Sequence, residues 1–161
     1  MFGKFIASAA SAALLAASAA TASAGELTRS IDVDASPAAV WAAIGPFCAI
    51  KDWHPAIATC VVDGKTPPTR TLVTKDGKTT FVEPETARDE ARHLYSYTFV
   101  GQPLPVSKYD ATIKVVPHGY RATIVWHGEY TPLAGKDKDV NDALVGIYES
   151  GLAAIKAKFA K

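Results

Sequence analysis

The sequence predicts an α+β fold in which a curved antiparallel sheet of seven strands surrounds one long C-terminal helix. Three observations predict it. Two short helical segments follow the first predicted strand, six further strand segments separated by turn residues fill the middle, and one long amphipathic pattern closes the chain. A single sheet of this size has one face to cover, and the long helix is the element available to cover it.

The first 24 residues of the 161-residue chain have the pattern of a removable export signal. Lys4 precedes an Ala-rich apolar stretch that begins at Phe5, and the segment ends in Ala-Ser-Ala, the small-x-small pattern of a cleavage site. A membrane anchor is the alternative, but the apolar stretch is shorter than the ~20 residues that span a bilayer. We therefore expect cleavage before Gly25, a single mature domain over 25–161 and a periplasmic or secreted location.

Charge and composition exclude several classes of partner. The net charge of +1 falls to zero without Lys4, and no basic cluster is present, which argues against nucleic acid and anionic membrane surfaces. No later apolar stretch is long enough for stable membrane insertion. Cys48 and Cys60 both lie in the mature part, so in an oxidising compartment they either pair or remain two separate buried thiols.

The first elements are predicted by alternation and by helix-start signals. Residues 27–33 alternate in the way a strand with one buried face does. Ser36 is a good N-cap and Pro37 suits the first helical position, so a helix should begin there and end at Gly45. The elements expected next are a short helix or turn over 49–54 and a strand over 57–62.

The middle of the chain is predicted to form one strand after another. Strands over 69–74 and 79–83 flank an Asp-Gly pair, which is a strong hairpin signal. The elements expected after it are a polar turn over 88–92, strands over 93–100, 108–116 and 120–130, and a loop over 101–105.

The last predicted element is a helix over 137–159. Its apolar side chains fall at helical spacing, its first turns carry acidic residues and its end carries lysines, as the helix dipole favours. Gly151 lies inside this helix, where glycine costs about 1 kcal/mol relative to alanine. We therefore expect a close packing contact at Gly151.

The order of several short motifs is similar to that of a known superfamily. The first two are Ser-Pro-Ala-Ala-Val-Trp at 36–41 and Trp-His-Pro at 53–55. The later ones are 97–101 before a Pro-Leu-Pro loop, Tyr109 with Ala111, 125–126 ahead of 130–132, and 148–155 in the final helix. Together they resemble the START-like superfamily (SRPBCC, Bet v 1-like), and the later motifs resemble its polyketide cyclase/dehydrase type 2 branch. The resemblance covers residues 30–161.

This resemblance implies a helix-grip fold with a deep, largely apolar cavity between the sheet and the last helix. Members bind lipids, hormones, polyketides or other hydrophobic small molecules, a minority catalyse cyclisation or dehydration, and some exported members are accessories of periplasmic oxidation systems. By similarity to hormone-receptor relatives, Glu83 would point into the cavity, and the loops over 75–78 and 101–105 would guard its mouth. A plain surface glutamate is the alternative for Glu83.

Strand parity assigns further side chains to the interior. The odd positions of 93–100 and of 108–116 would face inward, either lining a cavity or filling a core. A two-residue turn at 118–119 would pair Ala111 with Trp126 and place Trp126 inside, whereas a three-residue turn would turn it outward. The candidate ligand-binding residues are Glu83, Tyr95, Tyr97, Phe99, Val106, Tyr109, Ala111, Trp126, Ile147, Tyr148 and Gly151.

Signals for catalysis and for cofactors are weak. The four histidines have no metal-ligand spacing, and neither a nucleophile elbow nor a P-loop nor a Rossmann glycine pattern occurs, so no metal and no cofactor is predicted. The leading hypothesis is an exported protein that encloses a hydrophobic small molecule or lipid. The alternatives are a cyclase/dehydratase-like enzyme using Glu83 and a tyrosine as acid and base, and an accessory that docks on a periplasmic protein partner.

Overall fold

The computed structural model describes residues 23–160. Most of the predicted export signal, residues 1–22, therefore lies outside the described residues. The elements are β1 (Gly25–Val33), α1 (Pro37–Ile44), α2 (Ile50–Trp53), β2 (Ile57–Val62), β3 (Thr69–Thr74), β4 (Thr80–Asp89), β5 (Leu94–Thr98), β6 (Val106–His118), β7 (Arg121–Pro132) and α3 (Asp137–Lys158).

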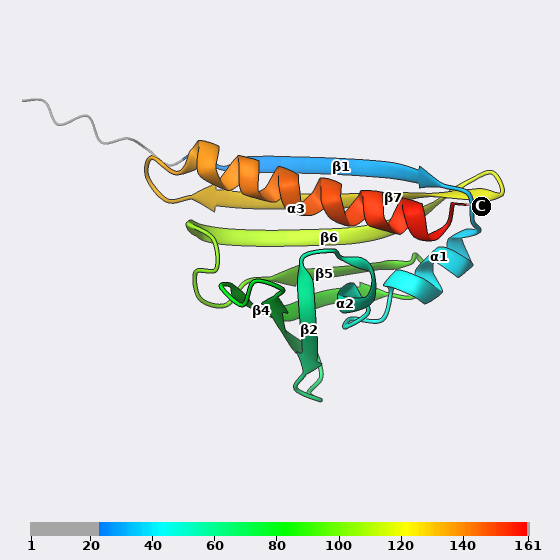
Figure 1. Ribbon diagram of the computed structural model, residues 1–161, viewed down its shortest axis with the longest axis horizontal. Coiled ribbons are helices and arrows are strands. Elements are labelled where there is room, and N and C mark those ends of the chain that lie inside the picture. The colour runs from blue at the N-terminus through cyan, green and yellow to red at the C-terminus, as the bar shows by residue number, and fades with distance from the viewer. Residues whose placement is uncertain (1–22, 161) are drawn as a thin grey trace, which may run out of the picture.

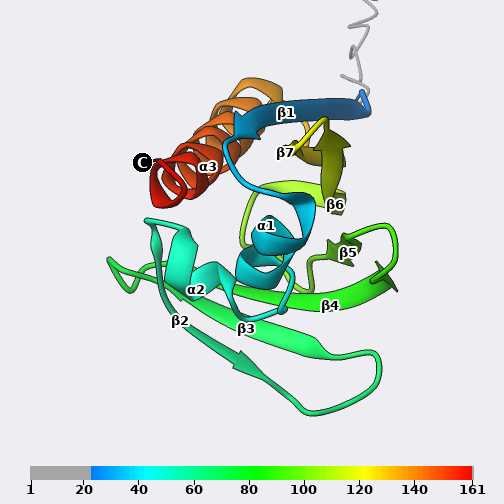
Figure 2. The ribbon, with the colours of Figure 1, turned by 90° about the vertical axis from the view of Figure 1, so that its right-hand side faces the viewer.

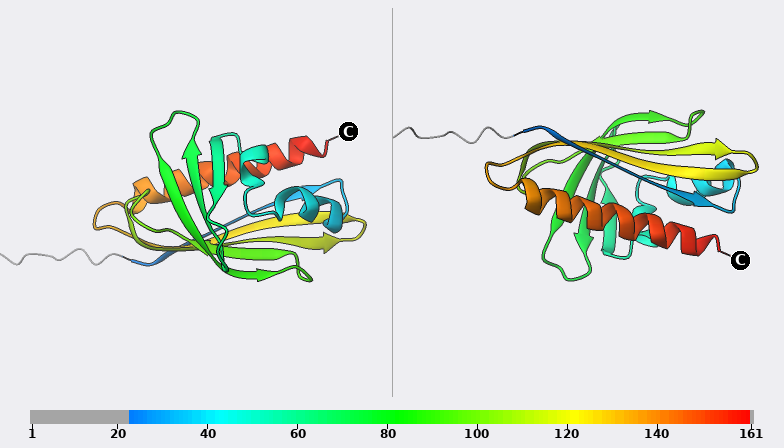
Figure 3. Two further views of the ribbon diagram at one scale, coloured as in Figure 1. Left: turned by 90° about the horizontal axis from the view of Figure 1, so that it is seen from below. Right: turned by 90° about the horizontal axis from the view of Figure 1, so that it is seen from above.

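The seven strands form one antiparallel sheet in the order β1-β7-β6-β5-β4-β3-β2. Figure 1 shows α3 lying along β1 and β7, at one side of the sheet. The sheet curves from there toward β3 and β2, and α1 and α2 lie inside the curve (Figure 2). Seen from above and below, the β2–β4 strands run across the direction of β6 and β7 (Figure 3). The predicted α+β architecture, a curved seven-stranded sheet around a long C-terminal helix, is confirmed.

Helix α1 begins where the capping signals predict. The Ser36 hydroxyl accepts a hydrogen bond from the Ala39 N–H at 3.3 Å, and Pro37 occupies the first helical position. The helix buries Val40, Trp41 and Ile44 against the sheet. Its position closes one end of the curved sheet, opposite the end at which the loop before β6 lies (Figure 1).

The register between β6 and β7 differs from the predicted one. The structure pairs Ala111 with Gly128 and Ile113 with Trp126, because the two-residue turn lies at 119–120, one position later than predicted. Moving the turn by one residue shifts each partner by two. Since side chains alternate with a period of two, Trp126 still points inward and is 1% exposed.

The predicted turn over 88–92 is wrong in its boundaries. Strand β4 continues to Asp89, and the turn is confined to the few residues before β5, with His93 at a φ of +50°. The polar stretch remains a strand because it pairs with β5, with Arg88 opposite Tyr95 and Asp89 opposite Leu94. Arg88 forms ion pairs with Glu85 at 2.7 Å and with Glu90 at 2.8 Å. A polar composition alone therefore did not distinguish a turn from a strand end.

The two cysteines are joined. A disulfide links Cys48, just before α2, to Cys60 in β2, with 5.4 Å between the Cα atoms. The sequence left open a disulfide or two separate buried thiols, and the structure has the disulfide. The bridge closes a segment that carries all of α2 and the start of β2.

Candidate functional site

A cavity of about 250 Å³ lies between the first half of α3, the α2–β2 segment and strands β3 to β7. Most of the side chains around it are apolar. The buried lining residues, which form its floor, are Ile50, His54, Ile57, Leu72, Phe81, Glu83, Tyr97, Tyr109, Trp126 and Leu144. The lining residues that are half-buried or exposed are Ala56, Thr74, Thr79, Phe99, Leu104, Ala143 and Ile147, and these surround its mouth.

The mouth lies near both loops that the resemblance implied. Thr74 and Thr79 flank the turn over 75–78, and Leu104 belongs to the loop over 101–105. The turn is held by its own hydrogen bonds, since the Thr74 hydroxyl donates to Asp76 at 2.6 Å and accepts from the Thr79 N–H at 3.1 Å. The mouth of the cavity is therefore bordered by a tight hairpin turn and a Pro-rich loop.

One ion pair is buried in the cavity wall. Arg70 Nε donates to Glu83 Oε2 at 2.7 Å, and both side chains are almost fully buried, at 0% and 5% exposed. Arg70 also donates to the Phe47 carbonyl at 2.6 Å, and its guanidinium lies 4.3 Å from the Phe47 ring centroid. The two residues are direct cross-strand neighbours on β3 and β4. Glu83 lines the cavity, whereas Arg70 lies behind it.

Burial and pairing act on Glu83 in opposite directions. Burial raises the pKa of the Glu83 carboxyl, and the positive charge of Arg70 and the hydrogen bond from it oppose that rise. Burial lowers the pKa of the Arg70 guanidinium, but Glu83 together with Tyr95 and Tyr97 raises it above its ordinary value, so the guanidinium stays protonated. The wall thus carries two charges that cancel.

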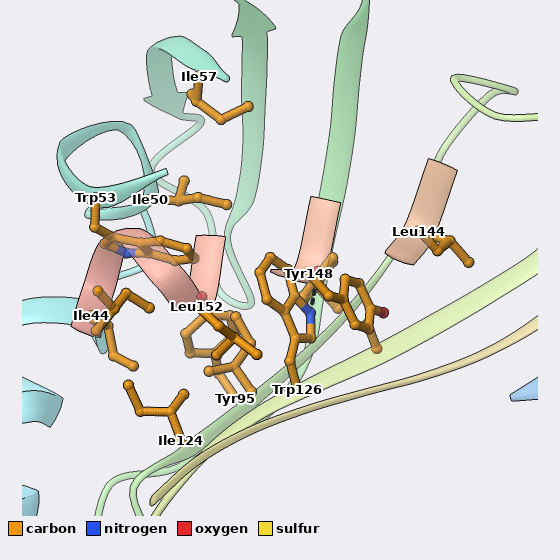
Figure 4. Close-up of a cluster of buried hydrophobic side chains, with 14 of the residues drawn as sticks. Ile44, Ile50, Trp53, Ile57, Tyr95, Ile124, Trp126, Leu144, Tyr148 and Leu152 are labelled. Carbon is orange, nitrogen blue, oxygen red and sulfur yellow. Dashed lines mark hydrogen bonds between the residues drawn. The ribbon is translucent and has the colours of Figure 1, made fainter. Parts of the chain in front are cut away.

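Three phenols near the cavity and one indole form two hydrogen-bonded pairs. Trp126 Nε1 donates to the Tyr97 hydroxyl at 3.1 Å, and the Tyr109 and Tyr148 hydroxyls are 2.7 Å apart. Burial raises the pKa of both Tyr97 and Tyr109 well above 10, so these groups are neutral and keep their protons. Tyr148 stacks on Trp126 with the ring centroids 4.3 Å apart, as Figure 4 shows.

His54 lies where the floor meets the packed part of the core. Its Nε2 donates to the Ile147 carbonyl at 3.0 Å, and its Nδ1 accepts from the Ala56 N–H at 3.2 Å, an arrangement that requires a neutral ring. Burial lowers the pKa of His54. Both ring nitrogens are engaged, so His54 connects α2 to α3 and is not available as an acid or base in this state.

The close packing contact expected at Gly151 is present, and it is made by three aromatic rings. A Cβ at this position would lie 2.8 Å from His54 Cδ2, 2.9 Å from a Trp126 ring carbon and 3.1 Å from a Trp53 ring carbon. Real side chains do not approach this closely, so only glycine lets the three rings lie against α3. The Trp53 and Trp126 rings meet edge to face with centroids 5.8 Å apart (Figure 4).

Six predicted site residues surround the cavity and five do not. Those that line it are Glu83, Tyr97, Phe99, Tyr109, Trp126 and Ile147. Those that the structure places elsewhere are Tyr95, Val106, Ala111, Tyr148 and Gly151, all of them buried in the packed core. Strand parity correctly gave the side of the sheet, but the position along each strand decides whether a side chain meets the cavity or other side chains.

The contributions of β3, and of Ile50, Ala56 and Ile57 in the α2–β2 segment, were not predicted from the sequence. Arg70 and Leu72 on β3 face inward together with their cross-strand partners Glu83 and Phe81 on β4. A signal for them was present, because the predicted hairpin with a loop over 75–78 places position 70 opposite 83. Leu144 belongs to the apolar stripe of the helix predicted over 137–159, but its place at the cavity was not predicted.

Metal ligands and membrane-spanning helices were sought among the described residues. Within 23–160, no cluster of three or more histidine, cysteine, aspartate or glutamate side chains is arranged to hold a metal ion. None of the helices in that range combines the length and the apolar character needed to cross a bilayer.

Several solved structures are similar in fold to this chain. The chain is 29% identical to an uncharacterised protein from Bacillus thuringiensis, with a TM-score of 0.77, covering 84% of this chain and 98% of that one. It is also 29% identical to the protein XoxI from Bacillus cereus, with a TM-score of 0.77, covering 83% and 94%. Norcoclaurine synthase from Thalictrum flavum, solved with a transition-state analogue, has 19% identity and a TM-score of 0.69 over 86% and 96%, and so shows the fold alone.

The family assignment rests on the sequence as well as on the fold. No curated protein matches the chain. Residues 24–160 match the family described as polyketide cyclase / dehydrase and lipid transport, which confirms the resemblance seen in the motifs. The chain belongs to this family.

Proposed function

We propose that this protein is exported and encloses a small hydrophobic molecule in the cavity between the sheet and α3. The observation that carries the proposal is the cavity itself, about 250 Å³ lined mostly by apolar side chains in an interior that is otherwise closely packed. Binding would come mainly from apolar area removed from water, at ~25 cal/mol per Å².

The cavity volume limits the size of the ligand. It corresponds to roughly eight water molecules at ~30 Å³ each, and it exceeds the ~150 Å³ apolar cavity known to take up benzene. This size favours a molecule of about eight to twelve non-hydrogen atoms over a lipid with two acyl chains.

Export is supported by two independent features of the chain. The first is the pattern of the first 24 residues, and the second is the disulfide between Cys48 and Cys60, since such bonds persist in oxidising compartments. Mass spectrometry of the protein recovered from the periplasm or medium tests this, with a new N-terminus at Gly25 expected. An intact Met1 in a cytoplasmic fraction contradicts it.

Ligand binding is tested by filling the cavity. Ala143 lines the cavity from α3, and Ala153 is exposed on the same helix. Titration with para-ethyltoluene, followed by NMR shifts, should show saturable binding to the wild type and to Ala153→Phe, and loss of binding in Ala143→Phe. Equal binding to both variants, or none to the wild type, contradicts the proposal. Native mass spectrometry of protein from its own host would identify the co-purified molecule.

One observation favours an enzyme as a second candidate. Glu83 is a carboxyl group with a burial-raised pKa in an apolar cavity, beside the phenol of Tyr97, as an acid/base catalyst would be. In that case Glu83→Gln should abolish turnover of an aromatic, polyketide-like substrate while the protein stays folded. Against it stands the ion pair with Arg70, which occupies one carboxylate oxygen.

A further inference from the structure

The polar end of the cavity offers one hydrogen-bond acceptor and one donor. Arg70 Nε occupies Glu83 Oε2, and among residues 23–160 no protein group donates to Oε1. The Tyr97 oxygen accepts from Trp126 Nε1, which leaves its own proton to donate. The negative charge of Glu83 contributes to the raised pKa of Tyr97, and the Arg70 guanidinium lies 4.9 Å from the Tyr97 ring centroid. Tyr97 pairs with Glu85, two residues along β4 from Glu83, and Glu83 and Tyr97 both line the cavity, so the two groups are neighbours on one face of the sheet.

The charge of the wall restricts the charge of the ligand. Arg70 and Glu83 cancel each other in an environment where an uncompensated charge is strongly unfavourable. A carboxylate ligand would leave a net negative charge in the buried site and an ammonium ligand a net positive one. A neutral ligand leaves the balance unchanged.

From this geometry we infer that the cavity selects a small neutral molecule with a hydroxyl group, which donates to Glu83 Oε1 and accepts from Tyr97. A hydroxyl group is the neutral group that supplies both the donor and the acceptor with one atom. The apolar body of the molecule lies against side chains such as Leu72, Phe81 and Leu144. A ketone would satisfy Tyr97 and leave the carboxylate oxygen without a donor. This inference rests on the proposed function and assigns its ligand class.

The experiment compares four probes of similar size: para-ethylphenol, para-ethyltoluene, para-ethylbenzoate and para-ethylbenzylamine. Dissociation constants are measured at pH 7 by calorimetry or NMR on the wild type. The phenol should bind about tenfold or more tightly than the toluene, because a hydrogen bond to a charged group adds to the same apolar contact. The two ionic probes should bind more weakly than the toluene.

The outcomes separate this inference from the function on which it rests. Equal binding of phenol and toluene, or tightest binding of an ionic probe, overturns the ligand class and leaves cavity binding intact. Absence of binding by all four overturns the proposed function itself. The wild-type panel decides the question even if no variant folds.

A charge variant sharpens the test. Glu83→Gln keeps an oxygen for Arg70 Nε but leaves the guanidinium charge unbalanced, so the preference should move from the phenol to the benzoate. The matched control is Glu85→Gln, since Glu85 lies on the same strand, is 6% exposed and pairs with Arg88 away from the cavity. That variant should keep the wild-type order of probes. A folded Glu83→Gln variant with the wild-type order contradicts the assigned contact.

Discussion

The two halves of α3 have the same amphipathic pattern but meet different surroundings. In the first half, Ala143, Leu144 and Ile147 face the cavity. In the second half, Gly151 and Leu152 are packed without space against neighbouring side chains. One apolar stripe of one helix therefore borders a cavity at one end and a filled core at the other.

The difference comes from what lies opposite the helix. The second half meets aromatic rings of Trp53, His54 and Trp126, which glycine allows to approach closely. The first half faces β3 and β4, which turn away across the sheet (Figure 2). These strands contribute Leu72, Phe81 and Glu83 to the cavity wall. A helix stripe thus shows which face is buried, whereas the opposing elements decide whether the space is filled.

The largest effect on stability is expected from breaking the Arg70–Glu83 ion pair, in the cavity wall that the first half of α3 faces. Arg70→Met should lower the free energy of unfolding by about 3–5 kcal/mol, because it leaves the Glu83 carboxylate buried without its partner. Urea denaturation followed by circular dichroism measures this. The double variant Arg70→Met/Glu83→Leu removes both charges and should recover most of the loss. An equal loss in both variants would show that shape, and not charge, is what the pair contributes.

The disulfide is expected to contribute both to the stability of the protein and to the shape of the cavity. Replacing Cys48 and Cys60 by alanine should lower the free energy of unfolding by about 3 kcal/mol. Without the bridge, the unfolded chain is no longer held together at two residues that are 12 positions apart, and it gains conformational entropy. The enclosed segment carries Ile50, His54 and Ile57 of the cavity floor, so para-ethyltoluene should also bind more weakly. The reduced wild type serves as the control and should behave like the double variant. Unchanged stability and affinity would mean that the surrounding packing alone holds this wall.

Two glycines of α3 should respond in opposite directions to alanine. Gly151→Ala should destabilise the protein by about 1–3 kcal/mol, because its Cβ would overlap three aromatic rings. Gly146→Ala should stabilise it by up to about 1 kcal/mol through helix propensity, because a Cβ at this position would meet no atom within 4 Å apart from the adjacent residues and the backbone of the helix itself. Thermal unfolding of both variants gives the comparison. The same sign in both would contradict the tight packing of the second half.

The smallest expected effect is a pH dependence of stability that comes from His54, which lies between the cavity and the packed core. The folded state lowers the pKa of His54 below its usual 6.5, so as pH falls through 6.5 the unfolded state takes up a proton that the folded state does not. Stability should therefore fall with decreasing pH, by at most about 1.4 kcal/mol per pH unit from this group, until the folded pKa is reached. In His54→Gln, which keeps a donor for the Ile147 carbonyl, this part of the slope should disappear. An unchanged slope would assign the acid sensitivity to other groups.

Much of the fold was predictable because local signals agreed with one another. Ser36 and Pro37 predicted the start of α1, and the Asp-Gly pair predicted the β3–β4 hairpin. Alternation predicted that Tyr97, Tyr109 and Trp126 point inward, and this held for Trp126 although the predicted register was off by two. The turn position could not be read from a stretch with several turn-forming residues.

The cavity itself was only partly predictable. Parity cannot distinguish Tyr109, which lines the cavity, from Tyr95, which lies in the packed core, because both face the same side of the sheet. The pairing of Glu83 with Arg70 followed from the predicted hairpin but requires attention to cross-strand neighbours. The contributions of α2 and of Leu104 depend on how loops fold back over the sheet, which no local pattern specifies.

Local patterns in the chain were enough to specify the order of the elements, the buried face of each and the family, because periodicity, capping residues and turn residues act over a few positions. The place where space remains and the identity of the rings that pack against Gly151 became visible only in the folded molecule. These features depend on contacts between residues far apart in the chain, such as His54 with Ile147 and Trp126 with Tyr97. Such contacts depend on how the sheet curves, which is a property of the whole fold.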